Sequence, residues 1–292
     1  MKKGKGIENP ESRFSAVLLA AAKLPGVRIN RESYLRSALA RHCSEDVIRR
    51  AIEETPAAAG ISAELLDKLA NDSIRFETGK VSALSAAAGI PGIFALPATM
   101  PADLAQYFGH MVRIAQKLAY LYSWPDLFSD EGDDVDDATM GVLTLFLGVM
   151  VGTQSANAAV GKVAGLMAEQ VAKKLPQKAL THGAIYPVVK KVAAYLGVKM
   201  TTQSFSTTVS KAIPLIGAAV SGGLTFATFL PMAKRLKKHL AGLPLADASH
   251  RVTDDGDVVD VEVVEDNEPF ATTQADELGA STTAVKLEEP QP

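Results

Sequence analysis

The pair of residues in this chain best suited to acid–base chemistry is Asp103 and His110, which lie seven positions apart. On a helix, a spacing of seven places both side chains on one face, where a carboxylate can orient an imidazole and favour its protonated form. No nucleophile lies at a matching spacing, so we interpret the two as a structural hydrogen-bonded pair. An enzyme centred on Asp103 and His110 is kept as the third hypothesis for function.

Other patterns of catalytic or metal-binding residues are missing from the sequence. Its five histidines form no HExxH or HxxxH pair, and no GxSxG, GxGxxG or P-loop motif occurs. The acidic run 129–137 lacks the spacing of a calcium loop, and its last carboxylates are expected to face the N-terminus of a following helix. Cys43, the single cysteine, is predicted to be an inert, partly buried thiol. We expect no catalytic residue, no metal and no cofactor.

Charge divides the chain into two unequal parts. Residues 247–292 hold 13 acidic and 2 basic residues, a net charge of −11; subtraction from totals of 33 and 30 leaves 20 acidic and 28 basic residues in 1–246, a net charge of +8. The composition of 246–292 predicts a disordered acidic tail. Within it, 258–264 (VVDVEVV) is a candidate for strand addition to a protein partner, with a slightly sticky flexible stretch as the alternative. Because no aromatic residues are interleaved with the basic residues, we expect no nucleic-acid partner.

Helices are expected to position all of these residues. Only 6% of the residues are aromatic, and the apolar content is mostly Ala, Val and Leu, which favours close-packed helices. The sequence therefore predicts an all-α, multi-helix bundle with a disordered start at 1–10, an N-terminal helical region at 11–60, a helical domain at 61–245 and the tail. Apolar spacings and caps predict helices over about 11–23, 30–42, 44–55, from 62, 103–123, 138–175 and 177–196, with a further helix starting within 201–208.

Three stretches without charge stand out: 81–102, 138–161 and 212–233. Each has the roughly 20 residues that a membrane span needs. Prolines interrupt the first, a polar run at 153–157 interrupts the second, and the prolines of the third leave about 16 residues, roughly 24 Å, between them. Close-packed hairpins in a soluble or peripheral domain are therefore favoured, with shallow or re-entrant membrane insertion and true spans as the alternatives.

Two further groups of residues belong to these stretches. Small residues four apart let helix backbones approach closely, and the candidates for such packing are Gly148, Gly152, Gly161, Gly165, Gly217 and Ser221. A basic cluster follows the third stretch, an arrangement with which chains meet an anionic membrane surface. The candidate membrane-surface residues are Lys234, Arg235, Lys237 and Lys238.

Two blocks of the sequence resemble the EcsC protein family. Residues 89–127 (GIPGIFALPATMPADLAQYFGHMVRIAQKLAYLYSWPDL) are similar to the central signature of that family, and 213–240 (IPLIGAAVSGGLTFATFLPMAKRLKKHL) to its glycine-rich closing segment. The resemblance covers roughly 60–240. It implies a helical bacterial protein, named after a gene that neighbours an ABC exporter, and it supplies no catalytic residues.

These observations lead to two main hypotheses for function. The first is a non-enzymatic helical protein at the cytoplasmic face of the membrane, which contacts membrane lipid or an integral membrane protein such as a transporter. A start without a secretory signal and a single cysteine favour this cytoplasmic location. The second is a soluble interaction module whose acidic tail docks a partner protein.

Overall fold

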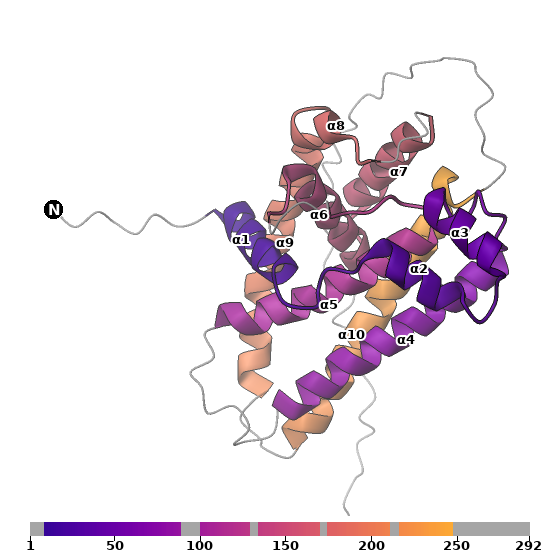
Figure 1. The fold of residues 1–292 in the computed structure, drawn as a ribbon. Helices are drawn as coiled ribbons and strands as arrows, with labels where there is room; N and C mark the ends of the chain where they lie inside the picture. The colour runs from indigo at the N-terminus through magenta and orange to yellow at the C-terminus, as the bar shows by residue number, and fades with distance from the viewer. Residues whose placement is uncertain (1–8, 89–99, 129–133, 170–173, 211–215, 248–292) are drawn as a thin grey trace, which may run out of the picture. The chain divides into compact units, whose positions relative to one another are not determined.

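The structure, a computed structural model, describes residues 9–88, 100–128, 134–169, 174–210 and 216–247. These residues form an all-α multi-helix bundle, which confirms the predicted fold class, and no strand occurs among them (Figure 1). The chain divides into two units, 1–252 and 253–292. Every described element lies in the first unit. The second unit makes up most of the predicted tail and lies outside the described residues. The helices are α1 (Pro10–Ala22), α2 (Arg31–Leu39), α3 (Glu45–Glu53), α4 (Ala63–Ala88), α5 (Met100–Leu121), α6 (Asp137–Val151), α7 (Gln154–Glu169), α8 (Gln177–Thr181), α9 (Tyr186–Ser210) and α10 (Ile216–Ala241), followed by the short 3₁₀ helix η1 (Pro244–Ala246).

Capping residues begin several of these helices. The side chain of Asn30 accepts a hydrogen bond from the backbone N–H of Ser33 at 2.8 Å, as predicted for the start of α2. Asp136 does the same for Thr139 at 2.7 Å at the start of α6, so the end of the acidic run faces the positive end of that helix, also as predicted. Residues 129–133 of that run lie outside the described residues.

Helix α9 continues where the sequence predicted an end. We expected a helix over 177–196 that stops at Gly197, but α8 and α9 are separate and α9 runs through that glycine to Ser210, which also replaces the further helix expected within 201–208. A Cβ at Gly197 would lie 2.0 Å from the carbonyl oxygen of Pro10 in α1. The glycine therefore serves a close helix–helix contact and does not end the helix.

The uncharged stretch 138–161 forms a buried helical hairpin. The prediction of one helix over 138–175 is wrong, because Gly152 adopts φ 89° and ends α6, after which α7 begins at Gln154. Helix α6 packs against α5, α7, α8, α9 and α10, and twelve of its fifteen residues are buried. For this stretch the structure confirms close-packed hairpin formation.

Helices α4 and α10 lie side by side and antiparallel (Figure 1). Near the end of α10, the ammonium of Lys237 contacts Asp67 and lies 3.2 Å from the Asn71 side-chain oxygen, near the start of α4. Pro231 does not shorten the third uncharged stretch as expected, because α10 is one helix through it. Both Pro231 and Ala227, whose carbonyl loses its intrahelical partner there, are exposed, so water can satisfy that carbonyl.

Candidate functional site

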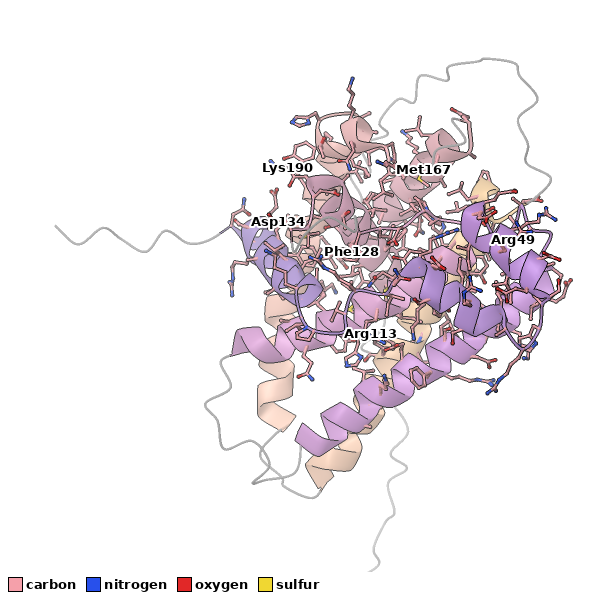
Figure 2. The ribbon with its side chains drawn as sticks, viewed as in Figure 1. Arg49, Arg113, Phe128, Asp134, Met167 and Lys190 are labelled. Carbon is pink, nitrogen blue, oxygen red and sulfur yellow. The ribbon has the colours of Figure 1, made fainter. Side chains whose placement is uncertain are left out.

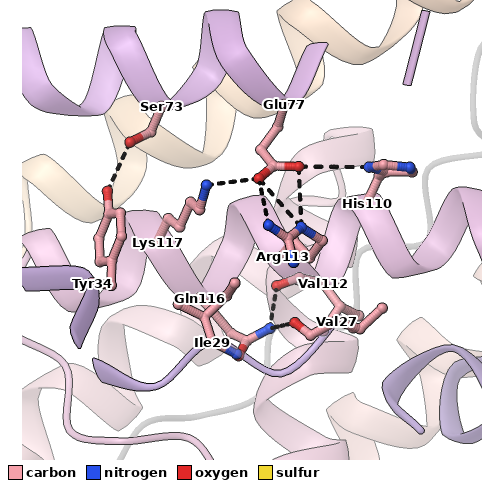
Figure 3. A network of polar contacts seen from close by, with 10 residues as sticks. All are labelled: Val27, Ile29, Tyr34, Ser73, Glu77, His110, Val112, Arg113, Gln116 and Lys117. Carbon is pink, nitrogen blue, oxygen red and sulfur yellow. Dashed lines mark hydrogen bonds and ion pairs between the residues drawn. The ribbon is translucent and has the colours of Figure 1, made fainter. Parts of the chain in front are cut away.

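A cluster of ionisable side chains lies between α4 and α5 (Figure 3). Glu77 comes from α4, and His110, Arg113 and Lys117 come from one face of α5 at spacings of three and four. The Glu77 carboxylate accepts hydrogen bonds from Arg113 Nε and Nη2 at 3.1–3.3 Å and from Lys117 Nζ at 2.7 Å. His110 Nδ1 lies 3.5 Å from Glu77 Oε2, a contact that becomes an ion pair when the imidazole is protonated.

This cluster is buried from solvent. The exposed fractions of the side chains are 0% for Glu77, 10% for Lys117, 12% for His110 and 18% for Arg113. Burial acts to raise the pKa of Glu77, but the neighbouring His110 and the hydrogen bonds from Arg113 and Lys117 outweigh it and hold that pKa well below its ordinary value of 4.5. The carboxylate is therefore ionised at neutral pH, and the cluster is a charged network inside the bundle.

The sequence predicts one member of this cluster, His110, but with Asp103 as its partner. The carboxylate that faces His110 in the structure is Glu77, and the side chain of Asp103, within α5, lies outside the described residues. Sequence reasoning missed Glu77 because its partners lie on another helix. One signal was available: Glu77 falls at helical spacing on the buried face that also holds Ile74 and Val81, where a carboxylate needs partners.

A neutral polar side chain, Gln116, holds α5 against the loop before α2. Its side-chain oxygen accepts from the Ile29 backbone N–H at 2.8 Å, and its amide donates to the carbonyls of Val27 at 2.9 Å and Val112 at 3.0 Å (Figure 3). Arg113, at the α4–α5 interface on the same helix, is labelled in Figure 2. Fixing this loop also fixes α2, which supplies Tyr34 to the neighbourhood of Lys117.

A shallow depression adjoins the charged cluster on its Lys117 side. Its volume is about 320 Å³, and it opens to solvent between α2, α4 and α5. At one wall the hydroxyls of Tyr34 and Ser73 lie 2.7 Å apart in a hydrogen bond. Burial raises the pKa of the Tyr34 hydroxyl, so that hydroxyl stays protonated. The lining consists of Tyr34, Ser37, Ala38, Leu69, Asp72, Ser73, Phe76 and Lys117.

The candidate packing residues differ sharply in their surroundings. A Cβ at Gly148 would lie 2.6 Å from Val192 Cγ1 and 2.7 Å from Ala156 Cβ, so this glycine is where α6 meets α7 and α9. Gly152 ends α6 beside the Arg235 guanidinium, whereas nothing lies within 4 Å of a Cβ at Gly165. For Gly161 the nearest atom is an ordinary contact at 4.0 Å, from Leu243. The surroundings of Gly217 and Ser221 lie outside the described side chains.

The four candidate membrane-surface residues point to different places. Lys237 is bound to α4, and Arg235 donates to the carbonyl oxygen of Met150 at the end of α6, where a cation is favourable. Lys234 and Lys238 are exposed one helical turn apart. Two of the four residues are thus held by contacts within the bundle, and two are available at its surface.

The remaining assignments have simple outcomes. Cys43 is half-buried, and burial raises the pKa of its thiol, so the expected weakly reactive cysteine is what the structure describes. No group of three or more His, Cys, Asp or Glu side chains gathers among the described residues. The segment 258–264 lies outside them.

The ends of α4 and α10 bring uncharged sequence together at one side of the bundle, and the uncharged end of α9 is tied to α10 by a short connection. Counting from the Lys237–Asn71 contact, Ile216 at the start of α10 and Ala88 at the end of α4 both lie roughly 25–32 Å away along their helices, in the same direction. Five residues join α9 to α10, so Ser210 lies within about 22 Å of Ile216. Helices α4 and α10, which pack against each other, reach this side together (Figure 1).

We call this region the uncharged end and define it as 81–88 of α4, 200–210 of α9 and 216–226 of α10, none of which holds a charged residue. Lys80, exposed, marks its border on α4. From Val81 to Ala88 the helix extends about 12 Å, well short of the ~30 Å hydrocarbon core of a bilayer. Consistent with this length, none of the helices in the described ranges combines the extent and apolarity of a membrane span. Comparison with protein-family models, with curated proteins and with solved structures gives no match.

Proposed function

We propose that this chain is a non-enzymatic helical protein of the EcsC type that acts at the cytoplasmic face of the membrane, where it contacts lipid or an integral partner such as a transporter. The observation that carries the proposal is the uncharged end, formed by 81–88, 200–210 and 216–226 from three helices. Within this end, 81–88 and 216–226 consist mainly of Ala, Val, Leu, Ile, Phe and Gly, a composition that favours contact with an apolar phase, whereas 200–210 is rich in Ser and Thr.

Charged residues of α4 limit how deeply the uncharged end can enter a membrane. Lys80 and Arg75 of α4 are exposed just beyond Val81, so only the last 12 Å or so of the bundle would enter the acyl region. That is less than half of the ~30 Å core, which favours shallow insertion in one leaflet. Such insertion leaves the charged cluster around Glu77 outside the acyl region.

Basic residues near the border would hold the headgroups. Lys80 lies over the Phe76 ring at 4.5 Å from its centroid, and the Phe76 side chain is 55% exposed. An aromatic ring and a long cation side by side are suited to the interface between acyl chains and headgroups. Lys234 lies about 27 Å along α10 from Ile216, so we assign the closest headgroup contact to Lys80 and a longer-range electrostatic role to Lys234 and Lys238.

Flotation with vesicles tests this proposal on the full chain. The unmodified protein should float with vesicles that contain anionic lipid. Leu84→Asp, in the part of the uncharged end that α4 supplies, should weaken flotation by about tenfold, because a carboxylate is costly in the acyl region. Ala63→Asp is the matched control, since Ala63 is exposed at the opposite end of α4 and should leave flotation unchanged.

Cell fractionation separates the two kinds of partner. Binding to cell membranes but not to protein-free vesicles, with the same sensitivity to Leu84→Asp, would identify an integral protein as the partner. Recovery of the unmodified chain wholly in the soluble fraction at low salt, together with no flotation, would overturn the proposal.

A further inference from the structure

The charged cluster between α4 and α5 holds more positive than negative charge. One carboxylate, Glu77, faces two permanent cations, Arg113 and Lys117, in addition to His110. Among the described residues, no second carboxylate lies within 4.0 Å of either cation. Buried charges are normally matched by partners of opposite sign, because desolvation of an unmatched ion is costly. The cluster therefore has capacity for one more anion.

Lys117 is the cation of the cluster that a second anion can approach. Its ammonium has three N–H donors, and the described residues give it one acceptor, Glu77 Oε1 at 2.7 Å. The same nitrogen lies 5.1 Å from the ring centroid of Phe76 and 5.7 Å from that of Tyr34. Both rings, like Lys117 itself, line the shallow depression of about 320 Å³. A ligand in the depression thus lies beside Lys117, the residue that carries this ammonium.

The rest of the lining is largely apolar and partly hydroxylic. Leu69, Ala38 and the exposed face of Phe76 offer carbon surface, and the bonded hydroxyls of Tyr34 and Ser73 stand beside it. One acidic residue, Asp72, also lines the depression. Lys68 Nζ lies 4.0 Å from the Asp72 carboxylate and offsets part of the repulsion that an entering anion would meet.

We propose that this depression binds a small anionic amphiphile, a carboxylate or phosphate that carries an alkyl chain. The acidic group lies against Lys117 and supplies the missing negative charge, while the chain covers Phe76 and Leu69. This accounts for a 55% exposed phenylalanine beside a nearly buried lysine. The inference concerns a site on α2, α4 and α5 and does not depend on insertion of the uncharged end.

Titration calorimetry of the full chain with octanoate below its micellar concentration tests the proposal. We expect saturable binding at one site per chain. Lys117→Met should weaken it at least about tenfold, the effect of losing a charge-assisted hydrogen bond. Lys117→Met leaves Glu77 with Arg113 and His110, so the fold should persist, as circular dichroism can check. Lys162→Met removes the same charge from an exposed position on α7, outside the lining, and should change the affinity less than about twofold.

A second variant keeps the test decisive if Lys117→Met fails to fold. Phe76→Ser removes an exposed ring, so it should leave the fold intact and weaken octanoate binding. The proposal is overturned if octanoate shows no saturable binding, if Phe76→Ser and a folded Lys117→Met bind it as the unmodified chain does, or if neutral 1-octanol binds equally well.

Vesicles containing phosphatidic acid distinguish the two sources of the ligand. If Lys117→Met also reduces binding to these vesicles, but not to phosphatidylcholine vesicles, the ligand is a lipid headgroup with its chain. If vesicle binding is unchanged while octanoate binding is lost, the ligand is a free amphiphile. Inorganic phosphate alone should bind more weakly than octanoate, because it lacks the chain that covers Phe76.

Discussion

The α6–α7 hairpin and the α4–α5 interface are both buried, yet they fill the interior by opposite means. Helix α6 has no charge after Asp137 and packs by close approach, with Gly148 against Val192 and Ala156. The α4–α5 interface encloses one carboxylate, Glu77, with the long cationic side chains of α5. The uncharged residues of α6 therefore lie in the core, as lack of charge suggests. The charged residues of the α4–α5 interface also lie inside, although charge usually indicates the surface.

This difference has a physical cause in how each interface is stabilised. At Gly148 the backbone of α6 comes close enough for dispersion contacts, which depend on volume and tolerate no added atoms. Around Glu77 the free energy depends on matched charge in a site with little water, where removal of one partner strands the others. The two interfaces should consequently respond to different substitutions and to different solvent conditions.

The largest expected effect is the loss of the Glu77 charge. Glu77→Gln keeps the side-chain shape but leaves Arg113 and Lys117 buried without a carboxylate, so the free energy of unfolding should fall by about 3–5 kcal/mol. Denaturant unfolding followed by circular dichroism measures it. Glu64→Gln, on the exposed first turn of the same helix, should change stability by less than about 1 kcal/mol. Equal stabilities for the two variants would mean that the cluster contributes nothing to the fold.

A smaller loss is expected at the close contact of α6. Gly148→Ala places a methyl group 2.6 Å from Val192 Cγ1 and 2.7 Å from Ala156 Cβ, so α7 or α9 must shift. We expect a loss of about 1–3 kcal/mol, even though alanine has the higher helix propensity. Thermal and denaturant unfolding measure the loss, and an unchanged or raised stability would contradict close packing at this point.

The pH dependence of stability should separate the two interfaces further. The pKa of Glu77 is depressed in the folded chain, so its contribution is present above the ordinary value of 4.5 and is lost as pH falls below that value toward the folded-state pKa. The stability gap between the unmodified chain and Glu77→Gln should narrow as pH falls from about 4.5. Gly148→Ala should keep a constant gap over the same range. Parallel curves for Glu77→Gln would rule out a depressed pKa.

The smallest effect, and one of opposite sign, is expected at Gly165. This glycine also belongs to a pair of small residues four apart, but nothing lies within 4 Å of an added Cβ. Gly165→Ala should therefore raise the free energy of unfolding by about 0.5–1 kcal/mol through helix propensity alone. A loss comparable to that of Gly148→Ala would show that both glycines pack closely.

Local features of the sequence were good predictors of the fold. The cap at Asn30 and the approach of the last carboxylates of 129–137 to the start of α6 agree with the predictions, because each depends on a side chain and a backbone within a few residues. Cys43 is half-buried, as predicted. Helix ends were predicted less well where glycine or proline was taken as a stop. Gly197 and Pro231 lie inside helices, since one is required by a neighbouring backbone and the other faces solvent.

By itself, then, the sequence determined the all-helical class and the positions without charge, because helix propensity, capping and periodicity act over one or two turns. Only the tertiary structure decided which uncharged stretch became core and which helices end together. It also decided that His110 faces Glu77 and that Lys117 borders an open depression. These relations join α4 to α5 and α4 to α10 across 30 to 170 residues, and contacts at such separations depend on how helices pack.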